Sequence, residues 1–96
     1  MKFYERAPDF AVEVRGEGDY GPAAEAAITK KREEYFAAGT LAVWDVNLLS
    51  EDVVKLWRSY APEGPRIFRR GDVAEAELAV PGWSTPVDDI FIELEN

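Results

Sequence analysis

Near its start the chain alternates between apolar and polar residues, as a half-buried strand does. Residues 10–14 (FAVEV) repeat with a period of two and are rich in β-branched and aromatic side chains. One face of this strand would carry Phe10, Val12 and Val14. The opposite face would carry Asp9, Ala11, Glu13 and Arg15. The pattern therefore predicts a strand with one apolar face and one charged face.

The next segment, residues 22–38, predicts a long helix. Pro22 suits the first turn of a helix, and Gly39 suits the position just past its end. Asp19 precedes the helix and is expected to cap its free amides rather than to bind a ligand. An apolar stripe with the spacing of a face packed on a sheet consists of Ala24, Ala27, Ile28, Tyr35 and Ala38. The charged residues outside this stripe are Lys30, Arg32, Glu33 and Glu34. Lys31 falls within the stripe, so it is predicted to be the lysine that points toward the sheet.

The second half of the chain predicts further strands. Residues 41–46 (LAVWDV) are mostly apolar, which favours a central strand. Residues 52–60 alternate and are expected to form an antiparallel hairpin with it. Residues 61–65 predict a loop, residues 66–69 a short fourth strand, and residues 87–91 a helical turn after a proline.

Together these elements predict a small α/β (α+β) fold. The first two strands flank the long helix, and the second and third form a hairpin, so the expected sheet is mixed with the helix on one face. A chain of 96 residues suits one domain, spanning 1–96. A domain of this size buries only about 60–65% of its unfolded surface, so its stability would gain from a partner.

Composition narrows the chemistry that is available. The chain has no histidine and no cysteine, so a metal site would have to use oxygen ligands, which favours Mg²⁺, Mn²⁺ or Ca²⁺. A catalytic base would have to be a carboxylate, a lysine, a tyrosine or metal-bound water. The net charge of −8 disfavours general binding to nucleic acid or to anionic membranes. No apolar run is long enough to span a membrane and the start lacks a signal peptide, so the expected compartment is the cytoplasm.

Two segments of the chain resemble a known family. The ordered set PDFAVEVRGEGDYGP, KKREEYFAAGT and VWDV, followed by VPGWSTPVDDIF, is similar to the Uma-type family of restriction endonucleases, which has the PD-(D/E)XK nuclease fold. The likeness runs from about residue 7 to residue 91 and covers the carboxy-terminal half of that family's domain. It implies a truncated restriction-endonuclease-like core and a Mg²⁺- or Mn²⁺-dependent enzyme that hydrolyses phosphodiester bonds in DNA.

The resemblance also implies roles for individual residues. Glu13 matches the glutamate of the family motif that binds the metal, and the carbonyl of Val14 would be a second ligand. Arg15 stands where the motif has lysine and would bind phosphate, although a guanidinium cannot act as a base. The family's lysine matches Lys31 on the helix, where it would orient the attacking water. Asp45 is expected to have a structural role.

The metal-binding aspartate of the family lies before the segment matched here. Asp9 cannot replace it, because Asp9 and Glu13 are four residues apart on one strand, or roughly 13 Å. Glu5, Asp19 or a second subunit would have to supply the missing carboxylate. The alternative is a non-catalytic remnant that serves as a homo-oligomeric structural or interaction module. Without preceding strands, the first strand would be an open sheet edge, which predicts a homodimer joined through that edge.

Overall fold

The computed structural model describes residues 7–95 of the chain, which form one mixed α and β structure. Its elements in chain order are β1 (Phe10–Val14), α1 (Pro22–Ala37), β2 (Ala42–Val46), β3 (Val54–Arg58), β4 (Ala61–Phe68), β5 (Val73–Glu75), β6 (Ser84–Pro86) and α2 (Val87–Glu95). The first three predicted strands and the long helix are therefore confirmed. So is the hairpin between the second strand and the third.

The main sheet has four strands in the order β1-β2-β3-β4, with β1 parallel to β2 and the other pairs antiparallel. This confirms the predicted mixed sheet. All five residues of β2 are buried, as expected for a central strand. β1 lies at one edge of the sheet, and β4 lies at the other.

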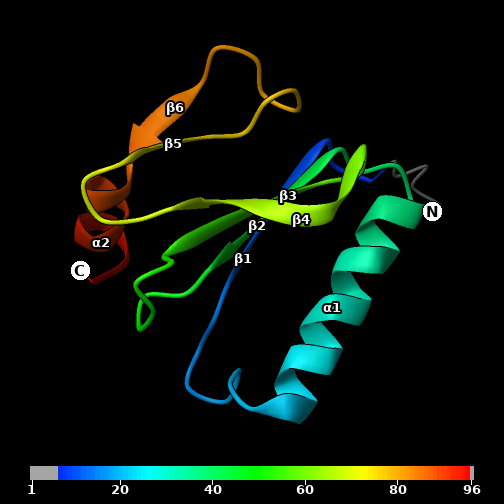
Figure 1. Ribbon diagram of the computed structural model, residues 1–96, viewed down its shortest axis with the longest axis horizontal. Helices are drawn as coiled ribbons and strands as arrows, with labels where there is room; N and C mark the ends of the chain where they lie inside the picture. Colours follow the sequence, from blue (N-terminus) through cyan, green and yellow to red (C-terminus); the bar gives the residue numbers. More distant parts are fainter. Residues whose placement is uncertain (1–6, 96) are drawn as a thin grey trace, which may run out of the picture.

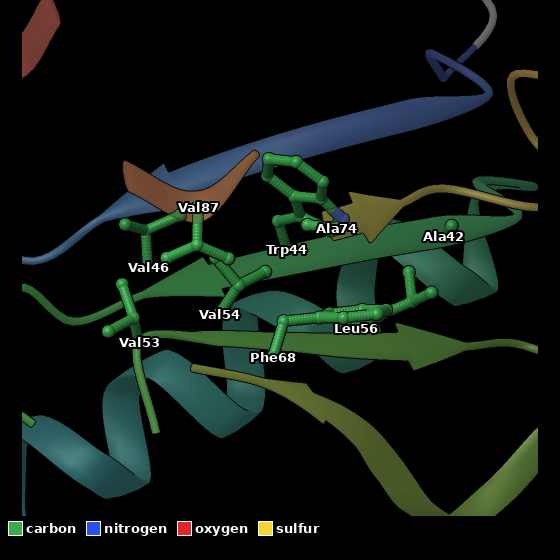
Figure 2. Close-up of a cluster of buried hydrophobic side chains, with 9 residues drawn as sticks. All are labelled: Ala42, Trp44, Val46, Val53, Val54, Leu56, Phe68, Ala74 and Val87. Carbon is green, nitrogen blue, oxygen red and sulfur yellow. The ribbon is translucent and has the colours of Figure 1, made fainter. Parts of the chain in front are cut away.

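Different layers cover the two faces of this sheet (Figure 1). Helix α1 lies against one face, while the small β5–β6 sheet and α2 lie against the other. The main hydrophobic core fills the second interface, where Trp44 and Leu56 from the sheet meet Ala74 and Val87 from the covering layer (Figure 2). By contrast, α1 contributes no fully buried residue. The interface beneath α1 is thus the more polar and more accessible of the two.

Three local features differ from the prediction. β4 begins at Ala61, so the segment APEGP belongs to a strand rather than to a loop. An edge strand tolerates proline, because one of its sides has no neighbour to receive hydrogen bonds. Strands β5 and β6 were not predicted, since three residues are too few to show a period of two. Helix α2 runs on to Glu95, beyond the single turn expected.

Both ends of α1 lie where the sequence predicts, with Pro22 in the first turn and Gly39 just past the last, and only the predicted cap differs. Gly39 follows the helix with φ near +110°, a conformation that residues with a Cβ atom avoid. At the start, however, the cap position is Gly21 and no side chain caps the helix. Asp19 instead accepts a hydrogen bond from the Gly16 amide at 2.8 Å, so it orders the preceding loop. Within the described residues, no helix is both long enough and apolar enough to cross a membrane.

Candidate functional site

The candidate site lies where the carboxyl end of β1 meets the first half of α1. Glu13 on β1 and Asp45 on β2 are opposite each other in the parallel register, and both side chains point toward α1. A cavity of about 560 Å³ opens between these strands and the helix, and its lining includes Glu13, Arg15, Lys31 and Asp45. The residues predicted from the sequence are therefore brought together, with Asp45 added to them.

Glu13 and Lys31, to which the family resemblance gives metal-binding and water-orienting roles, form an ion pair. The Lys31 Nζ lies 2.7 Å from the Glu13 Oε1, and the Tyr35 hydroxyl donates to the other carboxylate oxygen at 3.4 Å. The Lys31 side chain is 56% exposed and the Glu13 side chain is 32% exposed. The hydrogen bond to Glu13 raises the pKa of Lys31, which stays protonated at neutral pH. The pair thus lies at the rim of the site, in contact with solvent.

Arg15 is held much more tightly than Lys31. Its Nε and Nη2 atoms donate to the two carboxylate oxygens of Asp45 at 2.9 and 2.7 Å, which is a bidentate pair. The side chains of Arg15 and Asp45 are only 7% and 6% exposed. Glu25 on α1 pairs with the same guanidinium, and its Oε1 accepts from Nη2 at 3.0 Å. The hydrogen bonds that Arg15 donates to Asp45 and to Glu25 raise the pKa of Arg15 further, so this cation is permanent.

A different residue occupies the middle of the helix face. Arg32, predicted to lie off the apolar stripe, is half-buried between α1 and the sheet, with its guanidinium carbon 3.8 Å from the centre of the Trp57 ring. Burial lowers the pKa of Arg32, because the charged form loses water. Lys31, predicted to lie within the stripe, is exposed at its edge instead. The planar guanidinium explains the exchange, because it can stack on an indole ring.

The backbone of Val14 faces away from β2. The Arg15 amide donates to the Val46 carbonyl at 3.0 Å, and the Asp9 carbonyl accepts from the Leu41 amide at 2.9 Å. Successive residues of a strand direct their backbone groups to opposite sides, so the odd-numbered residues of β1 pair with β2 and the even-numbered ones point outward. Val14 also lines the cavity. Its carbonyl is therefore not used within the sheet.

The arrangement does not fit a magnesium site built from the described residues alone. Mg²⁺ needs several oxygen ligands in close to octahedral geometry. Both oxygens of Asp45 already accept from Arg15, and Glu13 is paired with Lys31. No group of three or more potential metal-binding side chains occurs in residues 7–95. Of the other carboxylates suggested by the sequence, Asp19 bonds its own loop, and Glu5 lies outside the described residues.

Comparison with known proteins does not identify a function for this chain. The chain matches no protein-family model, and no curated protein is significantly similar to it. The resemblance to the nuclease family therefore remains a prediction. The site contains two carboxylates that are ion-paired with cations, Glu13 with Lys31 and Asp45 with Arg15, and beside them the outer edge of β1, which no strand among residues 7–95 pairs with.

Proposed function

We propose that this protein is a non-catalytic interaction module that pairs with a second copy of itself through β1, on a scaffold of the restriction-endonuclease-like kind. The observation that carries the proposal is the outer edge of β1. Among residues 7–95 no strand pairs with that edge. A row of unpaired amides and carbonyls is a template for another strand, and a copy of the same chain always offers a matching one.

The side chains along this edge also favour a partner. Val12 and Val14 are 46% and 44% exposed, on the face that carries the aromatic core. Phe10, on the same face of β1, packs against Trp44 and Trp83, with ring centres 5.4 and 5.9 Å away. The exposed valines thus continue an apolar surface that begins in the core. Neither lysine nor proline, the residues that commonly protect an edge strand, occurs in β1.

The charged groups beside the edge support a structural role rather than a catalytic one. Arg15 cannot release a proton at any ordinary pH, and its guanidinium is occupied by Asp45 and Glu25. Both carboxylate oxygens of Asp45 accept a hydrogen bond from Arg15. Buried pairs of this kind cost much free energy when one partner is removed, which suits residues that fix β1 in place. The compartment we propose is the cytoplasm, where a chain without cysteine is unaffected by reducing conditions.

Light scattering after gel filtration tests the pairing directly. At micromolar concentration, the wild-type protein is expected to have twice the monomer mass. Val12→Pro removes an outward-facing amide from β1 and is expected to give a folded monomer. Leu49→Asp is the matched control, because it alters an exposed apolar residue in the turn after β2 and is expected to leave the dimer intact. A monomeric wild-type protein would contradict the proposal.

Nuclease activity is the second candidate, and one observation favours it. Glu13 and Lys31, the two residues that the family resemblance marks as catalytic, are in contact beside a cavity that Val14 also lines. In that case DNA would be the substrate and Mg²⁺ or Mn²⁺ the cofactor. The described residues provide too few free carboxylates for such a metal, so a further acidic residue would have to join Glu13.

Plasmid nicking separates the two functions. Supercoiled DNA is incubated with folded protein in Mg²⁺ and in Mn²⁺, beside the Glu13→Ala and Lys31→Ala variants. For an interaction module, none of the three proteins should cut above the level of a protein-free control. Metal-dependent nicking by the wild type that both variants lose would establish a nuclease and refute the non-catalytic role.

A further inference from the structure

We infer that two copies of the protein pair their β1 strands antiparallel, with Val12 opposite Val12 on the two-fold axis, to form one continuous eight-stranded sheet. This inference rests on the proposed dimer and specifies its geometry. It follows from three features of β1: the direction of its backbone groups, the order of its charges and its apolar face.

The direction of the backbone amides and carbonyls limits the registers in which two β1 strands can pair. In an antiparallel pair, hydrogen bonds form between residues whose amides and carbonyls point toward the partner strand, which in β1 are Phe10, Val12 and Val14. With Val12 on the axis, all three residues form hydrogen-bonded pairs: Val12 with Val12, and Phe10 with Val14 in both directions. With Phe10 or Val14 on the axis, only one such pair lies within the strand. The Val12 register thus satisfies the whole edge.

The charges exclude the two registers closest to it. With Ala11 on the axis, Asp9 would lie opposite Glu13 of the other copy, and with Glu13 on the axis the two Glu13 residues would face each other. Like charges directly opposite destabilise a strand pair. In the Val12 register, Glu13 lies opposite Ala11 and Asp9 lies opposite Arg15. The two Glu13 residues are then only diagonal neighbours, and each has its own Lys31 at 2.7 Å.

The same register also brings the apolar faces of the two β1 strands side by side. Val12 would pack on Val12, and Val14 would pack beside Phe10, whose ring already contacts Trp44 and Trp83. The half-exposed valines would therefore be covered by the aromatic cluster of the other copy. Pairs of an aromatic with a β-branched side chain are among those that stabilise antiparallel strands.

Single-cysteine variants measure the register, because the natural chain has no cysteine. Hydrogen-bonded partners in an antiparallel pair have Cα atoms about 5.5 Å apart, within the range of a disulfide. Val12→Cys is therefore expected to form disulfide-linked dimers in most chains on mild oxidation. Val14→Cys is the matched control, equally exposed but roughly 13 Å from its counterpart in this register, and it should not cross-link.

A second pair of variants makes the result independent of position 12. Ala11→Cys and Glu13→Cys should each fail to cross-link alone, and should form a disulfide-linked heterodimer when the two proteins are mixed. Cross-linking of Ala11→Cys alone, Glu13→Cys alone, or Val14→Cys but not Val12→Cys would overturn the register while leaving the dimer standing. If the wild-type protein is monomeric by light scattering, the proposed function itself is refuted.

Discussion

Replacing Arg15 with methionine would leave the Asp45 carboxylate buried without its partner, which makes this pair the most informative place to perturb the fold. The two side chains are 7% and 6% exposed and share two hydrogen bonds of 2.9 and 2.7 Å. The replacement keeps the apolar stem of Arg15 and removes only the charge. Asp45 would then have to stay ionised without compensation or become protonated.

The expected loss is large relative to the stability of so small a domain. Breaking a buried ion pair by removing one partner typically costs about 3–5 kcal/mol. At about 0.05–0.15 kcal/mol per residue, a chain of 96 residues has an unfolding free energy of roughly 5–14 kcal/mol. Arg15→Met should therefore remove at least a fifth of the stability and could remove most of it. Lys31→Met, at the solvent-exposed pair with Glu13, should cost no more than about 1 kcal/mol.

Urea unfolding followed by tryptophan fluorescence measures both changes at one fixed protein concentration. For a slope of about 1–3 kcal/mol/M, Arg15→Met should lower the midpoint by about 1 M or more. The double variant Arg15→Met with Asp45→Leu should recover much of the loss, because no charge is left buried. If Arg15→Met and Lys31→Met have the same midpoint, burial does not determine the cost of these pairs and our argument for the role of Arg15 is wrong.

Three further changes test other parts of the fold. Arg32→Ala removes the cation stacked on Trp57 and should lower the unfolding free energy by about 0.5–2 kcal/mol, with Arg32→Lys recovering only part of it; equal stability of all three proteins would contradict the stacking. Gly39→Ala forces a Cβ atom into a left-handed conformation and should cost about 1–2 kcal/mol in thermal unfolding, whereas Gly18→Ala, outside that conformation, should cost nothing. Arg15 donates a hydrogen bond that lowers the pKa of Glu25 below its usual 4.5, so the carboxylate stabilises the fold above that pH and the contribution is lost as pH falls through the lowered value. Glu25→Gln should therefore show a weaker loss of stability in acid than the wild type, and an unchanged pH profile would count against this pair.

Local patterns in the sequence were sufficient for the elements with strong periodicity. The alternation of FAVEV and the run LAVWDV predict β1 and β2, and the segment between Pro22 and Gly39 predicts α1. These signals depend only on spacing along the chain. The three-residue strands β5 and β6 have no such signal, because they form only when the rest of the chain brings them together.

The candidate site was predicted in part. The sequence places Glu13 on the charged face of its strand and directs Lys31 toward the sheet, and the two side chains meet in an ion pair. The partner of Arg15 was not predicted, since Asp45 is 30 residues away and is adjacent only through the parallel register of β1 and β2. The burial of Arg32, rather than Lys31, between the helix and the sheet was likewise not predicted. Both residues are long cations one position apart, and the rotation of the helix over Trp57 decides which of them is buried.

The sequence by itself determined the strands and helix that carry the site, the oxygen-only chemistry of a chain without histidine or cysteine, and the position of β1 ahead of every other predicted strand. The tertiary structure alone decided which charges neutralise one another, where the main core lies and that the outer side of β1 is open among the described residues. The physical reason is that periodicity fixes the direction in which a side chain points along its own element, whereas register and packing between elements fix what it meets there.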